Sequence, residues 1–179
     1  GPGVKKILVI NKSFELGGIQ MALANMLNVI CNDYDVSLAV FNPRGPLKSQ
    51  VPDNVNLIKL SPLVETLGMS VTDCKNFGTP IQKIFKLLSS FWAKLFGNSF
   101  PVFFAFLFQK HLGKYDTVVS YHQETSSKTM VTGFGKFALK KCEADKKIAW
   151  IHADFLATKL ATKKNLETYK KFDKIVSVS

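Results

Sequence analysis

Residues 6–30 read KILVINKSFELGGIQMALANMLNVI, and the apolar pattern of this stretch changes in its middle. Residues 7–10 form a continuous apolar run with β-branched members, which is typical of a strand buried on both faces of a parallel sheet. Further along, apolar residues share one face at helical spacing: Ile19, Leu23, Met26, Leu27 and Ile30. A polar loop ending in Gly17 and Gly18 separates the two segments. The stretch therefore predicts a strand, a glycine loop and a helix.

The glycine loop is a candidate anion site. The first N–H groups of a helix have no internal partner, and the positive end of the helix dipole lies there, so a phosphate can bind them. Gly17 and Gly18 have no Cβ atom, which lets a ligand approach the backbone closely. The loop lacks both the G-x-G-x-x-G fingerprint and the P-loop. The residues alone therefore leave a second interpretation open, in which the diglycine is a tight turn into the helix.

Length and composition describe one globular domain with a basic surface. Residues 1–3, GPG, resemble a cloning scar, which leaves 4–179 as the domain. A hydrophobic content of 46% excludes intrinsic disorder. Lys and Arg outnumber Asp and Glu by 24 to 13, and the resulting charge of +11 favours nucleotide phosphates, nucleic acid or acidic lipid as partners. The cysteines, Cys31, Cys74 and Cys142, are odd in number and scattered, which predicts a reducing cytosol without a disulfide framework or a zinc site.

Strands and helices alternate through the rest of the chain. Apolar runs predict five further strands, at residues 35–41, 55–60, 116–121, 147–152 and 174–179. Helices are expected between them, among others at residues 81–96, 127–141 and 156–171. The alternation predicts an α/β fold: a Rossmann-like, doubly wound, mostly parallel sheet of six or seven strands with flanking helices.

Polar residues follow two of the predicted strands. His122 and Glu124 come directly after 116–121, while His152 ends 147–152 and is followed by Asp154. Ligands of open α/β sheets bind at the carboxyl ends of the strands, so these side chains are candidates for a site. Two plain alternatives remain open: a polar loop can simply be solvated, and a lone histidine at a strand end more often packs or forms a hydrogen bond.

Residues 81–108 are unusually aromatic. The apolar residues of 81–96 share one helical face with lysines off it, and 100–108 is apolar all round but far shorter than the roughly 20 residues of a membrane span. These helices could cover one face of the sheet, or they could touch a membrane surface. We expect a mixed arrangement in which one face packs on the sheet and the other edge contacts lipid through Trp92, Phe96, Phe100 and Phe103.

The first strand and its loop carry a family resemblance. Lys6 to Ile10, a polar loop, and then Gly17, Gly18, Ile19 and Gln20 resemble the N-terminal domain of GT-B glycosyltransferases of family 4. The resemblance extends over nearly the whole chain. It implies one half of a GT-B fold, the acceptor-side domain, with the C-terminal donor-binding domain and its E-x7-E motif outside this chain.

The resemblance also implies an activity. Such an enzyme, a hexosyltransferase, transfers a sugar from a nucleotide sugar to a glycan or a lipid-linked acceptor, here in bacterial polysaccharide synthesis, and we expect no metal or other cofactor. It implies a cytoplasmic protein that is peripheral on the inner face of the cell membrane, and an isolated domain that is inactive. The implied roles are diphosphate binding by Gly17 and Gly18, catalysis by His152 at the donor sugar, and acceptor-side contacts by His122, Glu124 and Asp154. Asp154 matches only loosely, because the sequence reads H-A-D instead of H-D or H-N.

A function from another class remains as an alternative. A non-catalytic, basic α/β binding module could use the same charge to bind a nucleotide, nucleic acid or an anionic membrane surface. Nucleic acid is not an expected partner, because the aromatic residues concentrate in 85–108 instead of interleaving with basic residues on a sheet face. The donor sugar, the acceptor and the oligomeric state are not encoded in any motif of the sequence.

Overall fold

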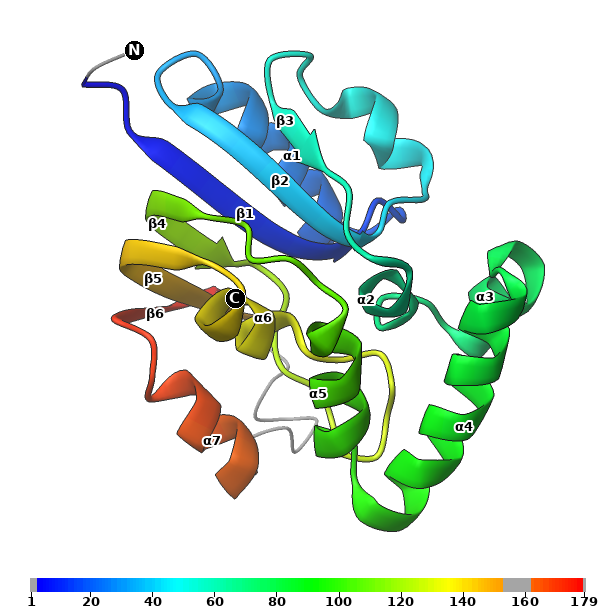
Figure 1. Cartoon of the computed structure of the whole chain (residues 1–179). Coiled ribbons are helices and arrows are strands. Elements are labelled where there is room, and N and C mark those ends of the chain that lie inside the picture. Colours follow the sequence, from blue (N-terminus) through cyan, green and yellow to red (C-terminus); the bar gives the residue numbers. More distant parts are fainter. Residues whose placement is uncertain (1–2, 153–161, 179) are drawn as a thin grey trace.

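In the computed structural model, which describes residues 3–152 and 162–178, six parallel strands form one sheet (Figure 1). The strands are β1 (Lys6–Ser13), β2 (Asp35–Asn42), β3 (Asn56–Ile58), β4 (Lys114–Ser120), β5 (Glu143–His152) and β6 (Lys174–Val178). Their order is β3-β2-β1-β4-β5-β6, so β1 lies in the middle and the direction of winding reverses between β1 and β4. The predicted Rossmann-like, doubly wound fold is confirmed.

The helices include several short ones in the long connection from β3 to β4. They are α1 (Gly18–Ile30), η1 (Pro46–Gln50), α2 (Pro62–Thr66), α3 (Val71–Phe77), α4 (Pro80–Phe96), α5 (Ser99–Leu107), α6 (Phe134–Lys140) and α7 (Lys163–Tyr169). The helix predicted at 127–141 begins later than expected. Gly133 has a left-handed backbone with φ 96°, which ends the preceding loop, and the Glu124 carboxylate accepts a hydrogen bond from the Gly135 N–H at 2.7 Å.

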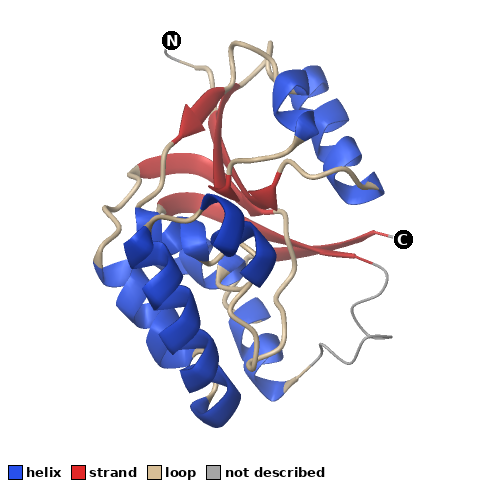
Figure 2. Ribbon diagram, turned by 90° about the vertical axis from the view of Figure 1, so that its right-hand side faces the viewer, coloured by secondary structure: helices blue, strands red, loops and turns tan. Residues whose placement is uncertain are grey.

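Each face of the sheet has its own apolar core. On one face, Val9, Leu38 and Tyr121 pack with α1 and η1. On the other, Leu8 and Ile10 pack with residues of α2, α5 and α6. The helices of this second core form the thicker layer (Figure 2). The apolar runs of β1 and β2 are buried on both faces, as their composition predicted.

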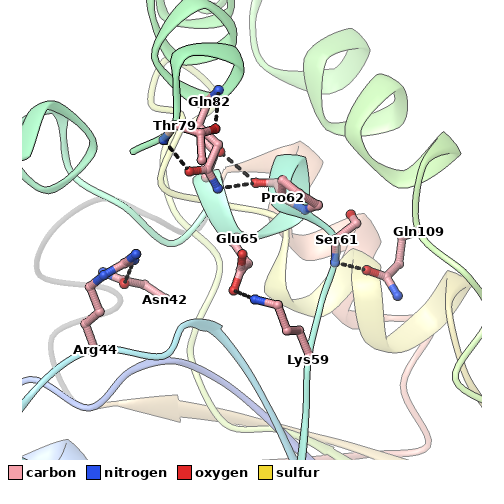
Figure 3. A network of polar contacts seen from close by, with 10 residues as sticks. Asn42, Arg44, Lys59, Ser61, Pro62, Glu65, Thr79, Gln82 and Gln109 are labelled. Atoms are coloured by element: carbon pink, nitrogen blue, oxygen red, sulfur yellow. Dashed lines mark hydrogen bonds and ion pairs between the residues drawn. The ribbon is translucent and has the colours of Figure 1, made fainter. Parts of the chain in front are cut away.

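The helix α4 lies at the outer edge of this layer, where it packs against α2, α3 and α5 (Figure 1). One face of residues 81–108 was expected to pack on the sheet. In α5 this holds, because Val102, Ala105 and Phe106 join the core of that face, but for the apolar stripe of α4 it is wrong, because the buried residues of α4 are Gln82, Lys86, Ser89 and Ala93. Polar contacts hold this inner side in place (Figure 3): Gln82 Nε2 donates to the Pro62 carbonyl at 2.9 Å, and Gln82 completes a capping box with Thr79. Hydrogen bonds of its polar residues thus determine which way α4 faces.

Candidate functional site

The carboxyl ends of β1 and β4 meet where the winding of the sheet reverses. Just beyond β4, the Tyr121 N–H donates to the Ile10 carbonyl at 2.9 Å, and the Tyr121 hydroxyl donates to the Ile19 carbonyl in the first turn of α1 at 2.7 Å. Burial raises the pKa of this hydroxyl, so Tyr121 stays a neutral donor. These bonds fix the start of α1 against the end of β4, at the position where doubly wound folds bind ligands.

The diglycine opens α1 at this point and is exposed. At both Gly17 and Gly18, no described atom lies within 4 Å of the place that a Cβ would take. Among the described residues no side chain caps α1, and its first turn contains no acidic residue. The start of this 13-residue helix therefore has no side-chain cap from the described part of the chain, and the positive end of its dipole lies beside the open space at the two glycines.

Asn11 adds a buried acceptor next to this helix start. The residue is fully buried at the end of β1, and its Nδ2 donates to the Ser13 carbonyl at 3.1 Å and to Gln20 Oε1 in α1. Its Oδ1 has no hydrogen-bond partner within the described part of the chain. A buried amide oxygen without a partner costs free energy, and a donor on a ligand could satisfy it. The sequence signal was an asparagine directly after an apolar strand run, and it was overlooked.

His152 is buried at the end of β5, beside Tyr121. Its Nε2 lies 3.1 Å from the Tyr121 carbonyl, and its backbone N–H donates to Gln123 Oε1 at 3.0 Å. A carbonyl can only accept, so Nε2 is the donor in this contact. His152 therefore shares this edge of the sheet with the residue that anchors α1. Asp154, the other acidic candidate here, lies outside the described residues.

His122 and Glu124 point toward the α6 side. The His122 ring lies 4.7 Å from the Phe134 ring. Glu124 is buried, its Oε1 accepts from Gly135, and its N–H donates to the Tyr169 hydroxyl at 2.7 Å. Burial raises the pKa of the Glu124 carboxyl, although the Gly135 bond and the charge of Lys136 oppose this. The geometry gives Glu124 a structural role at the start of α6, and contact of either residue with an acceptor stays a prediction.

A group of cations lies beyond the ends of β1 and β2. Arg44 donates from Nη1 to Asn42 Oδ1 at 3.3 Å, and Asn42 Nδ2 contacts Asp73 Oδ2 at 3.4 Å. Lys86 reaches inward from α4, and its Nζ donates to the Met69 carbonyl at 2.6 Å. Burial lowers the pKa of Lys86 to about 8, and the nearby charge of Lys12 acts in the same direction.

Lys12, Arg44 and Lys86 come from three separate parts of the sequence, so no local motif predicts that they lie close together. Lys12 and Lys86 interact electrostatically although they are far apart in the chain. Basic side chains thus lie near the edge of the sheet that carries the open diglycine, with Asp73 among them.

The four residues predicted to touch a membrane are all on the surface. The exposed fractions are 42% for Trp92, 69% for Phe96, 54% for Phe100 and 52% for Phe103. None of the helices in the described ranges combines the length and the apolarity needed to cross a bilayer. Contact with lipid stays a prediction at this point.

Neither a group of metal ligands in the described residues nor comparison with known proteins assigns a ligand to this site. Across residues 3–152 and 162–178, His, Cys, Asp and Glu side chains form no group of three that could hold a metal ion. Comparison of the chain with protein-family models, with curated proteins and with solved structures found no significant match.

Proposed function

We propose that this chain is the acceptor-side half of a glycosyltransferase that uses a nucleotide sugar. The observation that carries the proposal is the reversal point of the sheet, where the uncapped start of α1, with the open space at Gly17 and Gly18, lies beside the unsatisfied Asn11 Oδ1. The resemblance of residues 6–30 to family 4 enzymes supports the same assignment.

Each element would contribute a defined interaction. The N–H groups at the start of α1 would bind the diphosphate and stabilise the charge that develops on it as the leaving group departs. His152 would form a hydrogen bond to a donor-sugar hydroxyl through Nδ1, because its Nε2 already contacts the Tyr121 carbonyl. Lys12 and Arg44 would hold an anionic part of the acceptor, and this positioning lowers the entropic barrier to transfer.

The remaining roles follow from the same assignment. A second domain would bind most of the nucleotide, so this chain alone would transfer no sugar. The nucleotide sugar is the substrate, and we propose no metal or other cofactor. We place the protein in the cytoplasm, where it would act as a peripheral protein at the inner face of the cell membrane on a glycan or lipid-linked acceptor.

A titration of the ¹⁵N-labelled chain with UDP-glucose, GDP-mannose, UDP and uridine tests the proposal by nuclear magnetic resonance. We expect the diphosphate ligands to shift the amide signals of Gly17, Gly18 and Ile19, with a Kd on the order of 1 mM, and uridine to leave them unchanged. The variant Gly18→Asp should abolish these shifts, because its carboxylate would compete for the same N–H groups.

A matched control separates this local effect from a change in overall charge. Asn25→Asp adds the same charge to an exposed position in the middle of α1, and it should leave the binding of UDP within about twofold of the unmodified chain. Shifts that spread over a distant surface, or micromolar binding of a single-stranded RNA without shifts at Gly17 and Gly18, would contradict the proposal and favour the non-catalytic binding module.

A further inference from the structure

The helices α4 and α5 form a hairpin whose outer surface is apolar. Six side chains on this surface are each more than half exposed: Ile84, Leu88, Phe91, Leu95, Phe100 and Phe108. We call the surface that they form, with Trp92 between them, the hairpin face. The α4 members follow each other at spacings of four, three and four residues, so they share one side of the helix. Exposed apolar patches beyond a few hundred Å² are rare on monomeric proteins and mark interaction sites.

The orientation of this surface is fixed by polar contacts behind it. Gln82 and Lys86, on the inner side of α4, bond to the Pro62 and Met69 carbonyls. At the turn between the helices, Asn98 Nδ2 donates to the Ser126 and Thr129 carbonyls at 3.2 and 2.8 Å. Rotating α4 to bury its apolar side would break the bonds of Gln82 and Lys86. The Pro62 and Met69 carbonyls would then lose their hydrogen-bond donors, which costs free energy. The outward apolar face is therefore a stable feature of the fold.

Two adjoining hollows indent the hairpin face. One, of about 670 Å³, opens between α2, α4 and α5 and is lined by Ile84, Phe104 and Phe108, among others. The other, of about 200 Å³, lies beside Trp92 and Phe100. Phe85, Leu88 and Phe104 line both, so the two lie next to each other. Their lining is almost wholly aliphatic and aromatic, which suits hydrocarbon chains.

The charge around the hairpin face points to one occupant. Between Asp73 and Asp116 the sequence contains lysines but no Asp or Glu. Lys83 and Lys94 lie on the α3 flank of the face and line a further hollow between α3 and α4 with Lys75 and Lys86. Two copies of the chain meeting through this face would bring lysine flanks together without acidic partners, in a protein of charge +11. An anionic lipid surface offers both the apolar and the negative complement.

We infer that the hairpin face docks on an anionic lipid leaflet, with Trp92 and its apolar neighbours among the acyl chains and with Lys83 and Lys94 at the phosphates. This surface is separate from the glycine loop, so it would remain if the proposed transferase activity failed. It goes beyond that activity by defining which side of the molecule meets the membrane and what class of lipid holds it.

Fluorescence of the full chain tests this orientation. Trp92 and Trp150 are the two tryptophans of the sequence, so Trp150→Phe leaves Trp92 as the only one. We expect vesicles of phosphatidylcholine and phosphatidylglycerol (7:3) with brominated acyl chains to quench Trp92 emission by half or more relative to unbrominated vesicles. Absence of quenching in chain that sediments with the vesicles would overturn the inserted orientation.

Charge variants give matched controls. Phe91→Glu with Leu95→Glu should lower vesicle binding at least tenfold, whereas Val29→Glu, an equally exposed apolar position in α1, should change it less than twofold. Lys83→Gln with Lys94→Gln should lower binding to anionic vesicles roughly tenfold or more. Circular dichroism confirms that each variant is folded.

Three further results would overturn the inference. Equal binding to phosphatidylcholine vesicles without phosphatidylglycerol would remove the requirement for anionic lipid. Equal losses in Val29→Glu and Phe91→Glu/Leu95→Glu would remove the hairpin face as the contact. A chain that binds no vesicles but elutes as a dimer, and becomes a monomer in Phe91→Glu/Leu95→Glu, would identify a second copy as the occupant.

Discussion

The helices α4 and α6 belong to the same layer but use their side chains in opposite ways. In α6, Phe134, Phe137 and Ala138 are fully buried against the sheet, and Phe41 of β2 packs with both phenylalanine rings at 4.7 and 5.2 Å. In α4 the buried residues are mostly polar, while Phe91 is 67% exposed. One helix is held by apolar burial, and the other is held by capping and hydrogen bonds while its apolar side remains outside.

This difference shows that a helical apolar pattern does not by itself identify a core-facing helix. Both helices are rich in phenylalanine, so composition alone does not separate them. The two helices differ in their polar contacts. In α4, Gln82 and Lys86 donate to backbone carbonyls on the inner side, whereas α6 is contacted by Glu124 only at its start. An apolar pattern shows which residues share one face of a helix. Whether that face points to the core or to solvent depends on the hydrogen-bond partners that the polar face finds.

The largest expected effect comes from removing an aromatic ring in the α6 core. Phe137→Ala should lower the free energy of unfolding by about 3 to 5 kcal/mol, because it deletes a fully buried ring and leaves a cavity beside Phe41. Phe91→Ala, on the exposed side of α4, should change it by less than about 0.5 kcal/mol in the absence of lipid. Urea denaturation measures both, and equal losses would break the comparison.

The second largest effect is a pH dependence of stability that arises from the buried Lys86 of α4. The pKa of Lys86 is lowered from 10.5 to about 8 in the folded chain, so between these values the unfolded chain binds more protons. Stability should therefore rise with pH, by roughly 2 kcal/mol from pH 7.5 to 9.5, relative to a Lys86→Met variant. Urea denaturation at the two pH values measures this difference. Parallel pH profiles of the two proteins would show that folding does not lower the pKa of Lys86.

The smallest effect concerns the cap of α4. Thr79→Ala removes the hydroxyl that accepts from the Gln82 N–H at 3.3 Å and should cost about 1 kcal/mol. Thr79→Ser keeps the hydroxyl, so it should stay within about 0.5 kcal/mol of the unmodified chain in thermal unfolding. If both variants unfold together with the unmodified chain, the cap adds nothing, and packing against α2, α3 and α5 alone would hold α4.

Much of the fold could be predicted, because its strands are encoded locally. The run at residues 7–10 is apolar throughout, and the run at 36–41 is interrupted only by Ser37; such runs are typical of strands buried on both faces of a parallel sheet. The start of α6 could not be predicted, because it depends on Glu124 reaching Gly135 across a loop. The direction of α4 depends in the same way on contacts with Pro62 and Met69.

The candidate site was predictable only in part. Gly17, Gly18 and His152 were found because they follow strand patterns, and they do lie at one edge of the sheet. The cations of that edge were missed, because only the long connection between β3 and β4 brings Lys86 near enough to Lys12 for their charges to interact. The side chains of His122 and Glu124 point to α6, a direction that depends on the pairing of β4 and that their positions in the sequence did not reveal.

The central position of β1 has a consequence for the order in which the chain folds. Ile7 pairs with Thr117, so β1 gains its second neighbour only after most of the chain has been made. At about 5 to 20 residues per second, synthesis needs roughly 5 to 20 s to supply that partner. The hairpin of α4 and α5 precedes β4 and is complete within this interval. A nascent chain would thus present its apolar hairpin to a chaperone or a bilayer before the sheet that anchors the hairpin has closed.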